Sequence, residues 1–266
     1  MKTLNSLTMK KKASIFTAFI ILLFMFPACI FLGPSIEGNG NVTEENRKSG
    51  DFDEIEVSRG MNVYISQGDI TKVVVRADEN LMDAIETITE DNKLIVKAKQ
   101  NIRKAKSKKV FVTVPKIKEI SSSSGSNVYS ETKITSKNLE LSTSSGSNMT
   151  MEVNVGNLES SASSGSNLKL QIKAENIEAT ASSGSNIFIE GKTDAFKGKV
   201  SSGSNIKAED LSSESCTAQA SSGGNIWITA NKELNGKVSS GGNVFYYGNA
   251  ETKNIEKSSG GNVIKK

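Results

Sequence analysis

One five-residue string recurs eight times in the second half of the chain and constrains the fold more than any other feature. It reads Ser-Ser-Gly, then Ser or Gly, then Asn, and an apolar residue always follows. A string repeated at near-constant spacing indicates an internal repeat, in which each copy forms one unit of a stacked structure. The spacing is 18 to 21 residues between the glycines at Gly125, Gly146, Gly165, Gly184, Gly203, Gly223, Gly241 and Gly260.

The residues around each glycine fall into columns with a period of two. The third and seventh residues before the glycine are mostly small, β-branched or apolar, as is the third residue after it. Alternation with β-branched residues favours strands with one buried face over a helix. The asparagine column stands two residues after each glycine, at Asn127, Asn148, Asn167, Asn186, Asn205, Asn225, Asn243 and Asn262.

Only one strong turn signal recurs in each unit, whereas a hairpin meander would need one after every strand. The pattern therefore predicts an all-β fold: a right-handed parallel β-helix, or β-solenoid, with about 19 residues per coil. Glycine supplies a positive φ at the corner. Asparagines stacked in adjacent coils can pass amide hydrogen bonds along a ladder, so we assign that column a structural role.

Residues 51–115 carry shorter strand signals, which we expect to pack on or cap the coils. The segment 59–64 echoes the later Gly-x-Asn-apolar unit. The expected strands cover residues 53–58, 61–66, 72–77, 93–97 and 110–114, with a short helical turn within 78–87.

Several segments of the first half resemble a known family. Residues 52–56 are followed by Gly-Met-Asn-Val-Tyr-Ile-Ser-Gln-Gly at 60–68, by Val-Val-Val and Ala-Asp-Glu-Asn-Leu within 73–81, and by Lys-Leu-Ile-Val at 93–96. Together with the Ser-Gly-Ser-Asn units, they resemble the head GIN domain family of autotransporter adhesin-like proteins over residues 50–264. The resemblance implies a right-handed parallel β-helix and a role in adhesion. It implies no catalytic residues.

The N-terminus reads as an export signal. Three lysines precede an apolar run over residues 13–26, which is too short for a membrane span, and Ala28-Cys29 follows. We expect a lipoprotein signal peptide over residues 1–28, lipidation of Cys29, a flexible tether over 29–50 and one domain over 51–266, divided into strands (51–115) and repeats (116–266). An uncleaved anchor and plain secretion are the alternatives. The expected location is the cell envelope, at the outer membrane or cell surface, and otherwise periplasmic or secreted.

Composition excludes several classes of function. The chain has no histidine and two cysteines, Cys29 and Cys216, so it lacks a Ser-His-Asp triad, a Cys-His dyad and a histidine-ligated zinc. The net charge of +4 comes from four lysines before residue 13, and the remainder is neutral, which argues against a nucleic-acid partner. We expect no catalytic residue, no metal and no cofactor, and a buried, inert Cys216.

A candidate binding platform lies in the column four residues after each glycine, whose side chains point outward. We expect Phe188, Trp227 and Phe245 of this column, with Tyr247 two residues further on, to form an aromatic surface that stacks on sugar rings. The alternative is that the N-terminal strands or a second copy cover this face.

Two charged features have plainer interpretations. Residues 97–109 hold seven basic side chains, for which a solvated loop is favoured over contact with a polyanion or lipopolysaccharide. A loose acidic column at Glu131, Glu152, Glu190 and Glu209 is broken by Gln171 and is typical of a solvated face.

These features favour an envelope-anchored, non-catalytic binding or adhesion module. Its expected partners are a glycan or an envelope or host-surface protein, together with the membrane through the N-terminal lipid anchor. The alternatives are a structural envelope component without a ligand and a polysaccharide-active enzyme. The enzyme is disfavoured because coils of this length leave no room for the long loops that carry such sites.

Overall fold

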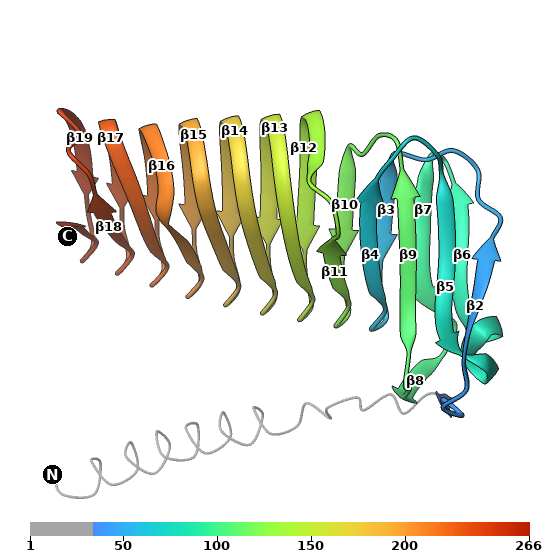
Figure 1. Cartoon of the computed structure of the whole chain (residues 1–266). Coiled ribbons are helices and arrows are strands. Elements are labelled where there is room, and N and C mark those ends of the chain that lie inside the picture. Colours follow the sequence, from blue (N-terminus) through green and yellow to red (C-terminus); the bar gives the residue numbers. More distant parts are fainter. Residues whose placement is uncertain (1–33) are drawn as a thin grey trace, which may run out of the picture. The chain divides into compact units, whose positions relative to one another are not determined.

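The computed structural model describes residues 34–266, and most of them lie in β-strands (Figure 1). The strands form a stack of coils closed at one end by a cap. The strands of the coils are β3 (Glu54–Val57), β4 (Asn62–Gln67), β10 (Glu119–Ser122), β11 (Asn127–Ser130), β12 (Ile134–Thr143), β13 (Asn148–Ala162), β14 (Asn167–Ala181), β15 (Asn186–Val200), β16 (Asn205–Ala220), β17 (Asn225–Val238), β18 (Asn243–Tyr247), β19 (Thr252–Lys257) and β20 (Asn262–Lys265). The cap contains β1 (Ser35–Glu37), β2 (Val42–Arg47), β5 (Lys72–Asp78), the 3-10 helix η1 (Glu79–Ala84), β6 (Ile85–Glu90), β7 (Lys93–Ala98), β8 (Asn101–Lys104) and β9 (Lys108–Val114).

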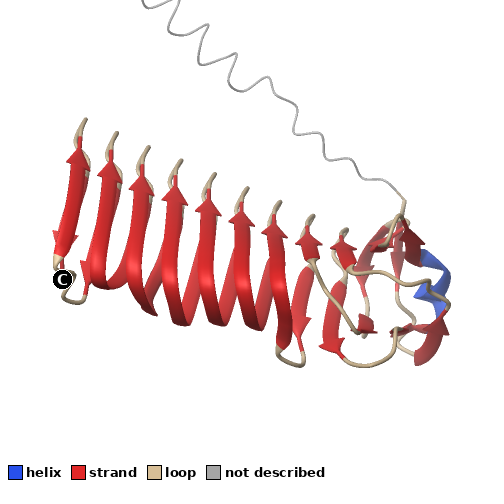
Figure 2. Ribbon diagram, turned by 90° about the horizontal axis from the view of Figure 1, so that it is seen from above, coloured by secondary structure: helices blue, strands red, loops and turns tan. Residues whose placement is uncertain are grey.

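Parallel pairing joins each coil to the next in the register that the sequence repeat predicts. Asn148 of β13 lies opposite Asn167 of β14, which lies opposite Asn186 of β15. Neighbouring coils are therefore one strand spacing apart, about 4.8 Å, and Figure 2 shows their strands as a single row. The prediction of a parallel β-solenoid with about 19 residues per coil is confirmed.

Each corner is a tight turn in which two consecutive residues have positive φ. Ser164 has φ 51° and Gly165 has φ 71°, and the amide of Ser166 donates to the carbonyl of Ser163 at 3.2 Å. These are the features of a type I′ turn. The sequence predicts the positive φ of the glycine but not that of the serine before it. The amide of Gly165 also donates to the carbonyl of Ser183 in the next coil, at 3.1 Å, so the turn is part of the inter-coil ladder.

Irregular repeat lengths are absorbed locally. The longest spacing, between Gly125 and Gly146, corresponds to a bend at residues 131–133 between β11 and β12. The spacing between Gly203 and Gly223 corresponds to an irregularity in β16, between Ala208 and Ser212. The columns on either side of each irregularity keep their register, because the extra residues bulge out of the ladder.

The first half of the chain supplies one further coil. β3 pairs with β10 and β4 pairs with β11, both in parallel, and Asn62 lies opposite Asn127. The corner between β3 and β4 has the same geometry as the repeats, with φ 55° at Arg59 and 73° at Gly60. This coil confirms that segment 59–64 is a copy of the repeat, separated from the next copy by residues 68–118.

The cap ends the parallel stack with antiparallel strands. β7 and β9 pair in parallel with β3 and β4, and β6, β5 and β2 then add antiparallel strands outside them. Val73, Val75, Leu81 and Ile85 are buried beneath these strands and continue the apolar core. The prediction that N-terminal strands cap or pack on the coils is confirmed.

Residues 35–37 and 42–47 form the paired strands β1 and β2, so the prediction of a flexible tether over 29–50 is wrong for that part. β1 pairs in parallel with β8, and β2 pairs with β5. The physical reason is the buried carboxylate of Asp78, which accepts from the amides of Gly40 at 3.0 Å, Lys106 at 3.1 Å and Ser107 at 2.8 Å. Burial alone would raise the pKa of Asp78, but these three donors and the nearby lysine charge lower it. Because β8 pairs with β1, part of the stretch 97–109, which was predicted to be a solvated loop, is a strand.

The apolar columns stack in register along the core. In the column seven residues before each glycine, each side chain lies opposite its equivalent in the next coil. The members are Leu139, Leu158, Ile177, Phe196, Cys216 and Leu234, and Lys253 takes this position in the last coil. The thiol of Cys216 is buried, and this desolvation raises its pKa to about 11, although the hydroxyl of Ser213 lies 2.7 Å from the sulfur. The environment of Cys216 is therefore that of an inert thiol.

The described part of the chain has its own core. The buried hydrophobic residues lie between Phe52 and Ala250, inside one compact unit, Ser35–Lys266. None of its helices has the length and apolarity needed to cross a bilayer.

Candidate functional site

The asparagine column forms a continuous hydrogen-bonded ladder. The side-chain Nδ2 of each asparagine donates to the Oδ1 of its neighbour, at 2.9–3.1 Å, from Asn262 back to Asn62. The structure thus brings together the eight predicted ladder residues and adds Asn62. Because each amide uses one donor and one acceptor within the ladder, the geometry is that of a scaffold.

A second, buried ladder lies beside the first and was missed by the sequence analysis. Ser166 Oγ accepts from the amide of Ser163 at 3.1 Å and donates to the carbonyl of Thr143 at 3.0 Å. The fully buried serines of this column are Ser126, Ser147, Ser166, Ser185 and Ser204, and all of them except Ser126 donate to a carbonyl of the preceding coil. The signal in the sequence is the fourth letter of the repeat, which is serine in the first five copies and glycine in the last three.

Trp227 and Phe245 form the stacked pair that the platform hypothesis requires. They lie opposite each other on β17 and β18, with ring centroids 5.1 Å apart and an interplanar angle of 19°. Both side chains are partly exposed. Lys266 Nζ lies 5.2 Å from the ring centre of Phe245. The two rings therefore lie face to face, and the pair presents the outer side of the stack, flanked by a cation.

The other two predicted platform residues are not stacked with this pair. One coil separates Phe188 from Trp227, and Lys207 occupies it, with its Nζ 5.4 Å from the Phe188 ring and 5.8 Å from the Trp227 ring. Tyr247 lies opposite Thr229, two residues beyond Phe245 on β18. Over β15–β18 the column therefore reads ring, lysine, ring, ring, so that Lys207 separates Phe188 from the Trp227–Phe245 pair.

A second aromatic stack stands at the cap end of the same column. Tyr64 lies between Phe111 and Tyr129, with ring centroids 5.1 and 5.3 Å away, and Lys109 Nζ lies 5.2 Å from the Tyr64 ring. The strands β9, β4 and β11 place these rings in register. Sequence reasoning missed Tyr64 and Phe111 as platform residues because they precede the regular repeats.

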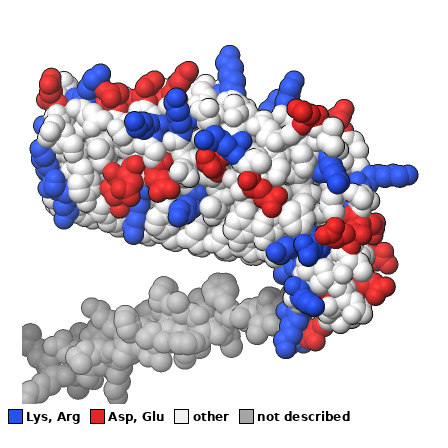
Figure 3. Space-filling view, in the orientation of Figure 1, with Lys and Arg blue, Asp and Glu red and all other residues white. Residues whose placement is uncertain are grey.

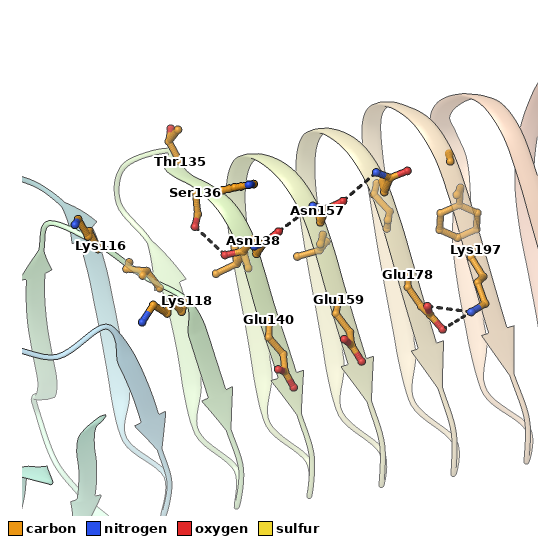
Figure 4. A pocket seen from close by; sticks show the side chains of 18 of the residues that line it. Lys116, Lys118, Thr135, Ser136, Asn138, Glu140, Asn157, Glu159, Glu178 and Lys197 are labelled. Atoms are coloured by element: carbon orange, nitrogen blue, oxygen red, sulfur yellow. Dashed lines mark hydrogen bonds and ion pairs between the residues drawn. The ribbon is translucent and has the colours of Figure 1, made fainter. Parts of the chain in front are cut away.

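A long groove runs across another face of the coils, over β12–β16 (Figure 4). It encloses about 940 Å³, and a three-residue unit that recurs in neighbouring coils lines it. Asn157 Nδ2 donates to Asn138 Oδ1 at 2.8 Å, and Asn176 Nδ2 donates to Asn157 Oδ1 at 2.9 Å. The sequence signal is Asn-Leu/Ile-Glu at 138–140, 157–159 and 176–178, which the sequence analysis did not single out.

The glutamates of these triplets form a row of carboxylates along the groove. Figure 4 shows Glu140, Glu159 and Glu178 on the same side of neighbouring strands. Burial and the charges of Glu119 and Glu159 raise the pKa of Glu140. A hydrogen bond from Lys197 at 3.0 Å lowers the pKa of Glu178. Like-charge repulsion and burial therefore disfavour the ionised carboxylate at the Glu140 end of the row, and lysine favours it at the Glu178 end.

The remaining acidic column is interrupted. Glu152 and Glu190 are separated by Gln171 in register, and Glu152 pairs with Lys133 at 2.9 Å. Within residues 34–266, no three acidic or cysteine side chains gather closely enough to ligate a metal. The predicted lipidation site, Cys29, lies outside the described residues.

The sequence matches a known protein family over most of the described residues. The family described as "Putative auto-transporter adhesin, head GIN domain" matches residues 51–171 and 161–250. The chain belongs to this head GIN domain family. The resemblance in its first half and in its repeats is thereby confirmed.

Solved structures of Parabacteroides proteins share this fold over most of the chain. A "putative lipid binding protein" from Parabacteroides distasonis is 24% identical with a TM-score of 0.79, and a putative adhesin from the same species is 21% identical with a TM-score of 0.79. A putative adhesin from Parabacteroides merdae is 18% identical, with a TM-score of 0.78. Each alignment covers 88% of this chain and all of the relative. No functionally curated protein matches the sequence.

Proposed function

We propose that this protein is a non-catalytic adhesion module of the bacterial cell envelope, which binds glycans by stacking sugar rings on Trp227 and Phe245. Membership of an adhesin family supports the general role. The stacked pair supports the finer proposal. Its two large rings, with centroids 5.1 Å apart, lie in the outward column, where the scaffold needs only polar side chains.

The chemistry of the pair suits a sugar. The apolar C–H face of a pyranose ring can pack across the exposed outer side of the two stacked rings, and the sugar hydroxyls need donors and acceptors beside it. Lys207 and Lys266 place ammonium groups beside Trp227 and Phe245 and can donate to those hydroxyls. The Phe111–Tyr64–Tyr129 stack offers a second face on the same column, at the cap end.

Anchoring at Cys29 is part of the proposal. The support is the charged and apolar leader that ends in Ala28-Cys29. Several acyl chains would hold the domain stably at a membrane, at about 0.8 kcal/mol per buried methylene. Mass spectrometry of the mature N-terminus checks this directly: a diacylated or triacylated Cys29 is expected, and an unmodified Met1 or a free residue beyond Cys29 would contradict it.

Glycan-array binding by residues 34–266 tests the ligand. The Trp227→Ala, Phe245→Ala double variant should lose roughly 5- to 100-fold in binding, because each stacked ring contributes about 0.5–1.5 kcal/mol. Phe188→Ala is the matched control, because Phe188 is exposed but does not stack on Trp227 or Phe245. Equal binding by the double variant, or binding of no glycan at all, would overturn the proposal in favour of a protein partner or a structural role.

A further inference from the structure

The basic stretch of residues 97–109 gathers around one hollow at the free end of the cap. Arg103, Lys104, Lys106 and Lys108 line this hollow, which encloses about 560 Å³. The first three are exposed, and burial lowers the pKa of Lys108. The ion pairs among the described residues do not involve these four cations. Figure 3 shows Lys and Arg side chains gathered on this part of the cap.

The acidic neighbours do not cancel this charge at the surface. Asp78 also lines the hollow, but it is fully buried and its carboxylate is occupied by the amides of Gly40, Lys106 and Ser107. Glu37 lies opposite Lys104 in the β1–β8 pair and is the one acidic side chain in that register. The solvent-facing rim of the hollow therefore carries a net positive charge.

The covalent chain leads from this rim toward the proposed anchor. Ser35 at the start of β1 lies opposite Asn101 at the start of β8. Six residues separate Cys29 from Ser35, and six residues reach at most about 20 Å when fully extended. A lipid on Cys29 would thus hold β8 and the basic rim within about 20 Å of the membrane surface.

We propose that the basic hollow docks on the phosphates of an anionic lipid surface, as a second membrane contact beside the anchor. The proposal rests on the anchoring of Cys29 in the proposed function, although the hollow itself consists only of described residues. The acyl chains on Cys29 would hold the domain at the membrane without fixing which face meets it, and a polybasic patch near an anionic surface adds about 1 kcal/mol per cation. The Trp227–Phe245 pair lies seven coil steps from the cap, about 34 Å away along the stack, so this docking would present it away from the membrane.

Vesicle co-sedimentation of residues 34–266 tests the hollow without the leader. The buried hydrophobic core of the described residues lies within this part, and a relative that crystallised aligns over its full length with 88% of this chain. We expect binding to vesicles of equal parts phosphatidylglycerol and phosphatidylcholine, no binding to phosphatidylcholine alone, and loss of binding as salt rises. The triple variant Arg103→Gln, Lys104→Gln, Lys106→Gln should bind on the order of 100-fold more weakly, at roughly fivefold per cation.

The matched control neutralises three exposed lysines on the sides of the coils: Lys169→Gln, Lys173→Gln and Lys192→Gln. This variant has the same net charge as the first and should bind like the wild type. Equal losses in both variants would mean that net charge alone drives binding and would overturn the site. Binding to heparin but not to the anionic vesicles would also overturn it, in favour of a different polyanion. An acylated Cys29 with a negative vesicle result would refute the hollow while leaving the anchor intact.

Discussion

Asn127 Nδ2 donates to Asn62 Oδ1 at 2.9 Å, across 65 residues of sequence. This bond joins the ladder of the repeats to the first coil, which the cap then closes. Tyr64 and Tyr129 stack two residues further along the same strands, at 5.3 Å. The repeat array and the first half therefore form one continuous scaffold, and the outward column continues across the join.

The asparagine ladder should be most sensitive to substitution in its interior. Asn186→Ala removes two side-chain bonds, those with Asn167 and Asn205, each at 3.0 Å. We expect a loss of about 1–3 kcal/mol in the free energy of unfolding, measured by urea titration. Asn262→Ala at the end of the ladder removes one inter-coil bond and should cost about half as much. Equal costs at both positions would argue against a ladder.

In the last coils, where glycine replaces the buried serine, substitution back to serine should destabilise the domain. A Cβ on Gly242 would lie 2.4 Å from the backbone carbonyl group of Ala220, so Gly242→Ser should destabilise the domain by about 1–3 kcal/mol or more through overpacking. Gly241→Ser is the control: its φ is 71° but its surroundings are open, so it should cost only about 1–2 kcal/mol. Urea unfolding compares the two, and a milder effect at Gly242 would contradict the steric account.

The glutamate row should give opposite pH dependences at its two ends, Glu140 and Glu178. The raised pKa of Glu140 means that its contribution to stability is present at acid pH and is lost as pH rises through its folded pKa. Glu140→Gln should therefore raise the melting temperature at pH 7 and leave it unchanged at low pH.

Glu178→Gln is the matched variant in the same row. Because Lys197 lowers the pKa of Glu178, its contribution is present at neutral pH and is lost as pH falls through the folded pKa. This variant should lower the melting temperature at pH 7, with the difference vanishing in acid. Both effects should be small and weaken with salt, since the side chains are solvated. Shifts of the same sign would contradict the electrostatic account.

The thiol of Cys216 should be unreactive in the folded domain. Its pKa of about 11 leaves little thiolate at pH 8, and burial blocks access. In residues 34–266, where Cys216 is the sole cysteine, a disulfide-exchange reagent should label it slowly in buffer and fully in urea. Rapid labelling without denaturant would show that the coil opens locally.

The sequence by itself determined the repeat architecture. The Ser-Ser-Gly string fixes a corner in each unit, and period-two alternation around it fixes which side chains enter the core, so columns such as the asparagines follow from spacing alone. The pairing of Trp227 with Phe245 follows in the same way, because equal offsets from successive glycines place residues in adjacent coils.

Only the tertiary structure decided what lies outside this periodicity. The antiparallel cap, the order of residues 35–47 around buried Asp78, and the convergence of Arg103, Lys104 and Lys106 on one hollow depend on contacts between segments far apart in the chain. No local repeat encodes such contacts. The physical reason is that stacked coils reuse one nearest-neighbour interaction, which a sequence period reveals, whereas the cap buries its groups through pairings that occur once each.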